Sequence, residues 1–284
     1  GPGFINFFVK DAWFAATVSG ILEAGKEYGR SDYGKGEKVM IEFVSANPTG
    51  PMHMGNARGG ALGDTVSNVL KRAGWDVTKE FYINDAGAQI DKFGRSLDAR
   101  YFQLLKGEDA VEFPEDGYQG DDIRELAKAF YEREGDKYVN ADVAERHDAL
   151  AQFGLSHNIP KMKTDLERYN VHYDVWFHES ELHDSGYVAE TVAMLTEKGW
   201  TYEKDGALWY KAGEYGEKYQ PKKHLNRDGV EEGIKDEVLV RANGNPTYFA
   251  ADIAYHRNKF ARGFDTCIDV WGADHHGHVA RMKG

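Results

Sequence analysis

The residues with the clearest chemical potential lie where a predicted strand is followed by a predicted helix. Residues 39–44 are β-branched, apolar or aromatic apart from Glu42, which is typical of a buried strand. Asn47-Pro-Thr-Gly-Pro51 interrupts regular structure, and a helical spacing of apolar residues follows from Gly55. In doubly wound α/β folds, ligands bind where such a strand ends and its helix begins. His53 and Gly55 lie at this junction, so we expect a ligand to bind there.

Glu42 and His53 each have a functional and an ordinary interpretation. A lone carboxylate inside an apolar strand is costly to bury, so Glu42 is hard to explain by packing. His53 is flanked by small or flexible residues that would let a ligand approach the backbone. A solvent-facing glutamate at a strand end and a plain loop histidine would give the same pattern. Short motifs often match by chance, so the pattern alone leaves both interpretations open.

The order of predicted elements indicates the fold class. Strands and helices alternate at both ends of the chain, which predicts a Rossmann-like, doubly wound parallel sheet of the α/β class. Between them, residues 106–236 are acidic and rich in amphipathic helices, which predicts a mainly helical insertion that splits the sheet. Asp205-Gly206 favours a two-residue hairpin inside it. The other expected elements are an extended segment at 4–9, helices at 11–28, 86–105, 121–134, 141–155, 160–169, 187–198 and 247–262, and strands at 77–83, 238–240 and 266–271.

Composition sets broad limits on the class of protein. The 284 residues, 41% hydrophobic and 29% charged, fit a soluble globular protein with a large core and a second lobe. No apolar run approaches the ~20 residues of a membrane span, and residues 1–3 do not resemble the start of a signal peptide. Cys267, in an apolar strand, agrees with a reducing compartment. We therefore expect a cytoplasmic protein with no membrane contact.

The sequence offers no strong metal-ligand spacing. His275, His276 and His278 are close together, but neither cysteines nor a second ligand cluster accompany them. We therefore expect no structural metal.

Four separated motifs resemble one family. His53-Met-Gly-Asn56, between Asn47-Pro-Thr-Gly-Pro51 and Ala57-Arg-Gly-Gly60, resembles the first class I aminoacyl-tRNA synthetase motif, the "HIGH" box, and the flanks resemble arginyl-tRNA synthetase. The fourth position of the box is Asn56 rather than histidine, so the sequence does not support two histidines that both contact the ATP phosphates. The other three matches, in the same order as in that family, are Phe81-Tyr-Ile-Asn-Asp-Ala-Gly87, Asn245-Pro-Thr-Tyr-Phe-Ala-Ala-Asp252 and Trp271-Gly-Ala-Asp-His-His-Gly-His278.

The resemblance implies that L-arginine is activated by ATP, which arrives with Mg²⁺. The arginine carboxylate would attack the α-phosphorus and expel Mg²⁺-pyrophosphate, so positioning and charge stabilisation would carry catalysis. His53 and Asn56 would be the catalytic residues, with His53 donating to phosphate oxygens and the helix start at Asn56 adding N–H donors. The residues that the resemblance implies for ATP binding are His53, Gly55, Asn56, Gly272, Asp274 and His278.

Arginine recognition requires carboxylates, because a guanidinium presents planar, paired donors. Tyr248 and Asp252 are four residues apart and therefore share one helix face, so Asp252 is our choice for the guanidinium. Glu179 is a second pocket acid, although its neighbour Glu181 is the alternative, and Glu42 with Asn47 would hold the α-amino end. The full set of residues that the resemblance implies for arginine binding is Glu42, Asn47, Glu179, Tyr248, Asp252 and His275.

The second step would transfer arginine to the terminal ribose of tRNA(Arg). A net charge of −12 opposes general affinity for a polyanion, although it leaves room for a local basic face. One compact basic run is either a solvated loop or a contact with the acceptor end of the tRNA. It consists of Lys218, Lys222, Lys223, His224 and Arg227.

The resemblance also implies a division of the chain. We expect a connecting segment at 1–36, the first half of the catalytic domain at 37–105, the insertion at 106–236 and a truncated second half at 237–284. A second catalytic loop and RNA-binding regions would lie outside this segment, which is then unable to charge tRNA fully, and we expect a monomer. Two alternatives remain: a small-molecule nucleotidylyltransferase, whose chains are usually shorter, and an inactive ligand-binding fragment.

Overall fold

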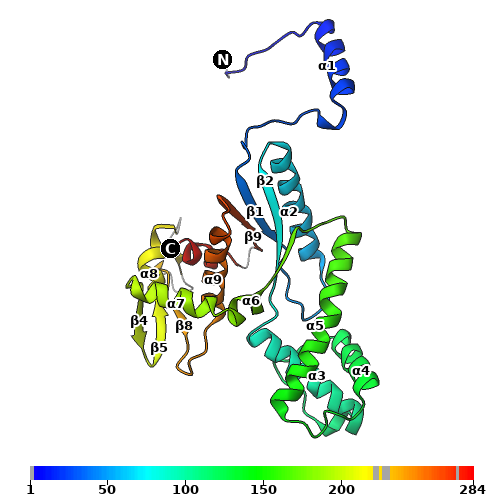
Figure 1. Ribbon diagram of the computed structural model, residues 1–284, viewed down its shortest axis with the longest axis vertical. Coiled ribbons are helices and arrows are strands. Elements are labelled where there is room, and N and C mark those ends of the chain that lie inside the picture. The colour runs from blue at the N-terminus through cyan, green and yellow to red at the C-terminus, as the bar shows by residue number, and fades with distance from the viewer. Residues whose placement is uncertain (1–2, 220–223, 226–230, 273–274) are drawn as a thin grey trace.

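A four-stranded parallel sheet forms the centre of the molecule. A computed structural model describes residues 3–219, 224–225, 231–272 and 275–284 (Figure 1). In this part of the chain the sheet has the strand order β3-β2-β1-β9, and each neighbouring pair is parallel. This confirms the predicted α/β class and the parallel sheet. The strands are β1 (Lys38–Phe43), β2 (Asp76–Ile83), β3 (Val175–His178) and β9 (Thr266–Val270).

Helices cover both faces of this sheet. On one face, Val39, Ile41 and Phe43 of β1 pack with Phe81 of β2 and with the helices α2 (Met54–Arg72) and α5 (Val143–Arg168). Helix α2 lies so close to β1 that a Cβ on Gly63 would come within 2.2 Å of the Phe43 ring. A residue with a side chain therefore does not fit at position 63. On the other face, Tyr82 of β2 packs with α9 (Tyr248–Ala261).

The face under α9 carries a row of three carboxylates. Glu80, Glu42 and Asp269 are register partners on neighbouring strands, Glu42 pairing with Glu80 on one side and Asp269 on the other. Glu80 is completely buried and Glu42 is 7% exposed. Buried carboxylates on adjacent strands repel one another, so the row requires cations from the helix above it.

Lys259 of α9 supplies the central cation. Its fully buried Nζ donates to Glu42 at 2.6 Å and also to Asp269. Burial alone would lower the pKa of Lys259, but the two carboxylates hold it above its usual value. Burial would likewise raise the pKa of Asp269, but a hydrogen bond with His256 and the charge of Lys259 hold it well below its usual range. The Lys259–Asp269 pair is therefore ionised.

The outer carboxylate, Glu80, is paired by the next turn of α9. Arg262 donates through both terminal nitrogens, at 2.6 and 2.8 Å, and the Tyr255 hydroxyl donates to the same carboxylate. Such a bidentate pair has well-defined geometry. Helix α9 is thus fixed over β2, β1 and β9 by ionic contacts.

Two further lobes flank the sheet. Helices α3 (Ala88–Lys106), α4 (Asp121–Glu134) and α5 form a helical lobe with its own core around Phe93, Phe130 and Phe153. A three-stranded sheet of order β4-β5-β8 lies on the other side (Figure 1). Its strands and neighbouring helices are β4 (Thr201–Lys204), β5 (Ala207–Tyr210), β8 (Glu237–Val240), α6 (Glu179–Asp184), α7 (Tyr187–Glu197), α8 (Ala212–Gly216) and α10 (His276–Lys283).

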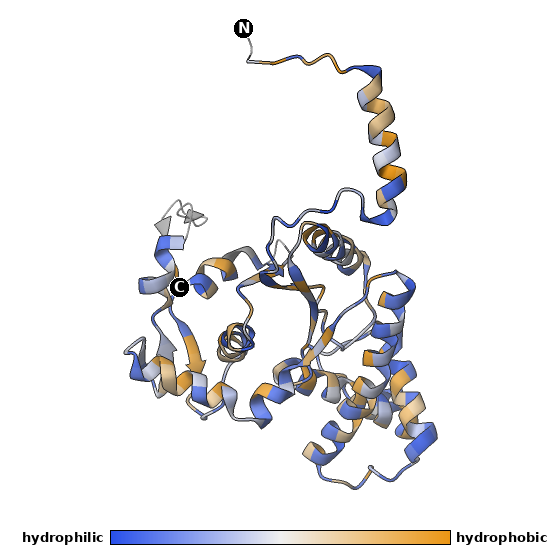
Figure 2. Ribbon diagram, turned by 45° about the horizontal axis from the view of Figure 1, so that its top comes forward, coloured by the Kyte–Doolittle hydropathy of each residue, from blue (hydrophilic) through white to orange (hydrophobic). Residues whose placement is uncertain are grey.

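The N-terminal helix α1 (Asp11–Ala24) projects from the rest of the molecule (Figure 2). None of its residues is buried, and its apolar side chains, such as Trp13 and Leu22, are exposed. The helix predicted from residue 11 is observed as α1, and a short 3-10 helix, Gly25–Glu27, follows it toward the predicted end near residue 28. Residues 4–9 form no strand.

Several predicted elements need correction. The two helices expected at 141–155 and 160–169 are one helix, α5, which continues through Pro160 because buried residues on both sides hold it against the sheet and α3. The predicted strand at 238–240 is present as β8, but it pairs antiparallel with β5 and lies outside the parallel sheet. The fourth parallel strand, β3, lies within the segment predicted as a helical insertion.

Other predictions agree with the structure. Asp205 and Gly206, both with positive φ, form the turn of the β4–β5 hairpin. The domain boundaries 1–36, 37–105, 106–236 and 237–284 stay predictions. Within the described residues, every helix is too short or too polar to cross a membrane.

Candidate active site

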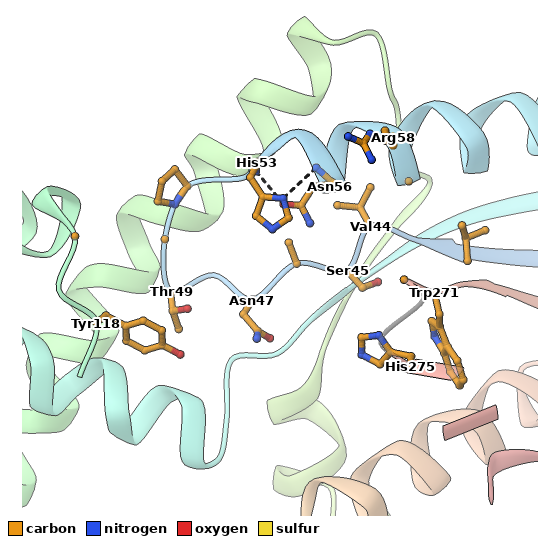
Figure 3. Close-up of a pocket in the computed structure, with 18 of the residues that line it drawn as sticks. Val44, Ser45, Asn47, Thr49, His53, Asn56, Arg58, Tyr118, Trp271 and His275 are labelled. Atoms are coloured by element: carbon orange, nitrogen blue, oxygen red, sulfur yellow. Dashed lines mark hydrogen bonds between the residues drawn. The ribbon is translucent and has the colours of Figure 1, made fainter. Parts of the chain in front are cut away.

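A cavity of about 850 Å³ opens at the C-terminal ends of β1 and β9 (Figure 3). One wall is the connection from β1 to α2, including Asn47 and Thr49, and continues to His53 at the start of α2. The opposite walls come from the connection between α3 and α4, at Tyr118, and from the segment after β9, at Trp271. Ligands of doubly wound sheets bind at this edge, because the loops that can close around a ligand meet there.

His53 begins α2 as its N-cap, with a defined ring orientation. The backbone N–H of Gly55 donates to Nδ1 of His53 at 3.1 Å, and the backbone N–H of His53 donates to Oδ1 of Asn56 at 2.9 Å. Because Nδ1 accepts, the proton of the neutral ring is on Nε2. The imidazole therefore presents an N–H donor to a ligand at the positive end of the α2 dipole.

Gly55 and Asn56 have local structural roles in this cap. A Cβ at Gly55 would lie 2.9 Å from Cε1 of the His53 ring, so a side chain there would displace the imidazole. Asn56 completes the reciprocal capping box through its Oδ1. Both residues also line the cavity, so their predicted roles in ATP binding and, for Asn56, in catalysis stay predictions.

A second group of polar residues lies under the N-terminal half of α9. Glu179, at the start of α6, is 5% exposed and contacts His183 Nε2 at 3.3 Å. With its amide turned to suit its neighbours, Asn84 donates to the other Glu179 oxygen at 3.1 Å. Asp252 of α9 contacts His278 Nε2 at 3.1 Å. We call the group Glu179, Asp252 and Tyr82 the acid pocket; none of the three lines the cavity described above.

The acid pocket is electrostatically strained without a cation. Burial raises the pKa of Glu179, contact with His183 offsets part of the rise, and the charge of Asp252 adds to it. The same two carboxylates, together with burial, raise the pKa of Tyr82, so its hydroxyl stays neutral. In the described part of the chain, neither Glu179 nor Asp252 forms an ion pair with lysine or arginine. A bound cation would relieve this repulsion.

Comparison with sequence models of protein families decides which of the families with this architecture applies. Residues 17–282 match the family described as tRNA synthetases class I (R), catalytic domain. The chain belongs to this family.

Individual relatives of this synthetase domain agree. Proteins described as "Arginine--tRNA ligase" from Ruminiclostridium cellulolyticum and from Acetivibrio thermocellus are each 58% identical over 284 residues. Each alignment covers 100% of this chain and 48% of the relative, so the chain spans about half the length of these curated relatives. A crystal structure described as an arginyl tRNA synthetase from Campylobacter jejuni superposes with a TM-score of 0.80 at 32% identity, covering 96% of this chain and 56% of that one.

The synthetase domain brings the predicted site residues together only in part. The cavity collects several of them from the β1–α2 and post-β9 segments. These are Asn47, His53, Gly55, Asn56, Gly272 and His275. Tyr248 is 65% exposed at the start of α9, and Asp274 lies outside the described residues.

Two predicted residues have partners that the sequence did not indicate. Glu42 lies in the carboxylate row rather than in the cavity wall, so an α-amino group would share it with Lys259. His278, predicted for ATP, pairs with Asp252, predicted for arginine, and packs against Trp271 with ring centroids 5.3 Å apart. Both assignments stay predictions. In the basic run, Lys222, Lys223 and Arg227 lie outside the described residues, so its contact with tRNA stays a prediction as well.

One wall of the cavity in this synthetase domain was not predicted from the sequence. Tyr118 and Gln119 of the α3–α4 connection and Asp122 in the first turn of α4 line the cavity together with the loop after β1. The Tyr118 backbone N–H donates a hydrogen bond to Oγ of Ser96 on α3 at 2.9 Å, which holds this connection against α3. The available signal was an aromatic residue between two glycines, Gly117 and Gly120, in an otherwise acidic loop.

Asn84 and Asp85, at the C-terminal end of β2, differ in role. Asp85 accepts from the Ser180 backbone N–H at 2.9 Å and contacts His178 Nδ1 at 2.7 Å, so it fixes the start of α6. Asn84 contacts Glu179 and thereby belongs to the acid pocket. Together they position Glu179.

Proposed function

We propose that this domain belongs to an arginine–tRNA ligase, which activates L-arginine with ATP and passes the arginyl group to tRNA(Arg). Membership of the class I (R) family and the two relatives at 58% identity support the reaction class. The observation that carries the choice of amino acid is the acid pocket, in which two buried or half-buried carboxylates contact histidines but form no ion pair with lysine or arginine among the described residues. A guanidinium supplies the missing charge and planar paired donors.

The chemistry follows from the two parts of the site. The arginine carboxylate attacks the α-phosphorus of ATP in line, forming arginyl-adenylate and releasing pyrophosphate with its Mg²⁺. Nε2–H of His53 donates to phosphate oxygens as negative charge develops, and the α2 N-terminus adds a positive potential. Gly272, which the family resemblance implies for ATP, and His275, which it implies for arginine, both line the cavity. Holding Glu179 and Asp252 at the far end of the amino acid fixes the carboxylate's direction of attack.

In the second step, a hydroxyl of the terminal tRNA ribose attacks the carbonyl of arginyl-adenylate, forming the ester and releasing AMP and a proton. Tyr118 and Asp122 line the cavity on its α3–α4 side. The proposal implies action in the cytoplasm, where ribosomes consume charged tRNA, and we retain the monomer as a prediction.

Arginine-dependent exchange of labelled pyrophosphate into ATP tests the proposal. We expect exchange with L-arginine and roughly 30-fold to a few thousand-fold less with L-citrulline, because losing the charge of one partner in a buried pair costs ~2–5 kcal/mol. Exchange that is independent of the amino acid, or equal for both amino acids, would contradict it.

A further inference from the structure

Tyr82 presents a buried hydroxyl whose role the fold does not explain. The residue is 7% exposed, and its ring packs against Tyr255 and Phe177, with ring centroids 4.3 and 6.1 Å away. Its hydroxyl is buried beside the Glu179 carboxylate but forms no hydrogen bond of good geometry within the described part of the protein. Burying a hydroxyl without a partner costs free energy, and a phenylalanine would fill the same aromatic stack without that cost.

The surroundings of this hydroxyl indicate what would satisfy it. The charges of Glu179 and Asp252 act on it most strongly after burial, so it lies beside both acids of the pocket. Glu42 also acts on it, but that carboxylate is already paired with Lys259. A neutral hydroxyl beside two carboxylates can donate to one of them and still accept a hydrogen bond from a cationic donor between them.

We infer that Tyr82 is a specificity-determining residue whose hydroxyl oxygen accepts a hydrogen bond from the guanidinium of the bound amino acid while its O–H donates to Glu179. The inference rests on the proposed function and adds a neutral third contact to the two acids. Arg and citrulline differ in charge, whereas the hydroxyl contact needs only a donor N–H in the right place. Tyr82 therefore fixes the orientation of the planar group, and the carboxylates supply the attraction.

Two features distinguish a ligand contact from a structural one. If the hydroxyl stabilised the fold, its removal would lower the melting temperature. A hydroxyl that is unsatisfied until the ligand arrives would leave the melting temperature unchanged or raise it, and its loss would appear in ligand affinity. The two roles thus predict opposite results for the same variant.

The test is calorimetric titration of the wild-type protein and Tyr82→Phe with L-arginine, with agmatine and with ATP. We expect affinity for arginine to fall about 10- to 100-fold, the range for a hydrogen bond to a charged group. Agmatine keeps the guanidinium and lacks the carboxylate, so it should lose the same factor. ATP affinity and the ligand-free melting temperature should not fall.

Tyr210→Phe is the matched control. Tyr210 is 5% exposed in the same hydrophobic cluster, but the charge that acts on its hydroxyl comes from Tyr215 and not from the acid pocket. Its arginine affinity should equal that of the wild type. Equal arginine affinity for Tyr82→Phe and wild type would overturn the inference alone. A loss with arginine but not with agmatine would also overturn it, because the contact would then lie at the other end of the ligand. Absence of arginine binding by the wild type would overturn the proposed function and the inference together.

Discussion

The domain contains two groups of buried acids that differ in one respect, the presence of matching cations. In the carboxylate row under α9, Glu80 meets Arg262 and Glu42 meets Lys259, with nitrogen–oxygen distances of 2.6 Å in both pairs. In the acid pocket, the basic side chains of the described residues that contact Glu179 and Asp252 are histidines, at 3.3 and 3.1 Å. Both groups contact α9. The acids near its C-terminal end stabilise the fold, and those near its N-terminal end are the proposed ligand contacts.

The difference gives a physical criterion for a binding site. Acids whose charge is neutralised by buried lysine or arginine are scaffold, because removing either partner leaves an unpaired charge in the interior. Acids whose burial raises their pKa without such a partner store repulsion that a cationic ligand relieves. Burial alone does not separate the groups, since Glu42 and Glu179 are 7% and 5% exposed.

The largest effect is expected where the row is broken. Lys259→Met leaves Glu42 and Asp269 buried without their cation and should destabilise the protein by about 3–5 kcal/mol. The matched control on α9 is Arg257→Met, because Arg257 pairs with Glu190 at the surface, where a pair contributes about 0–1 kcal/mol. Urea unfolding of the two variants measures the difference. Similar losses for both would show that the row does not hold α9 in place.

Breaking the acid pocket should instead affect binding. Asp252→Asn keeps the shape and the contact with His278 but removes the charge, so arginine affinity should fall by ~2–5 kcal/mol, roughly 30-fold to a few thousand-fold. Citrulline and ATP should lose much less. Calorimetry against Asp184→Asn, an exposed acid of α6, provides the comparison. Unchanged arginine affinity would leave Glu179 or Glu42 as the specificity carboxylate.

Substitution of His53, at the phosphate end of the site, should lower the rate of pyrophosphate exchange and leave arginine affinity nearly unchanged. His53→Ala removes one donor to the developing charge, for which a loss of about 10²–10³ in the exchange rate is expected. It also removes the α2 cap, so His53→Asn is the informative partner variant, because asparagine is a good N-cap and cannot place a ring N–H in the cavity. If His53→Asn exchanged pyrophosphate at the wild-type rate, the role of the ring would be refuted.

The smallest effect concerns stability without ligand. Because burial raises the folded-state pKa of Glu179 above its unfolded value, the protonated form favours folding, and wild-type stability is lost as pH rises through that raised pKa. Glu179→Gln cannot ionise, so it should be more stable than wild type at neutral pH, by an amount of the order of 1 kcal/mol. Below the ordinary carboxyl pKa the two should converge. Thermal melts across pH 4–8 measure this, and a variant less stable than wild type at pH 7 would count against the strained pocket.

The sequence predicted those parts of the fold that depend on local order. The strand–loop–helix unit around His53, the hairpin at Asp205-Gly206 and the capped helix α9 each follow from residue types within one short segment. The four motifs, taken together, also predicted the family. These features are encoded by neighbours in the chain.

Features that depend on pairing between distant segments could not be predicted in the same way. Strand β3 has only four residues, and its place beside β2 is set by partners about 95 residues earlier. The mutual pairing of Glu42, Lys259 and Asp269 joins three separate segments, so Glu42 alone looked like a ligand-binding acid. The Tyr118 wall of the cavity depends on how α3 and α4 pack, which no local pattern encodes.

The central claim is that Glu179 and Asp252, which contact no lysine or arginine among the described residues, bind the guanidinium, and that the carboxylates paired with Lys259 and Arg262 do not. A crystal structure with L-arginine tests it most directly. The guanidinium nitrogens should lie about 3 Å from the carboxylate oxygens of Glu179 and Asp252, with the Lys259 contacts of the row unchanged. A guanidinium bound at Glu42 in place of Lys259, or outside the acid pocket altogether, would contradict the account.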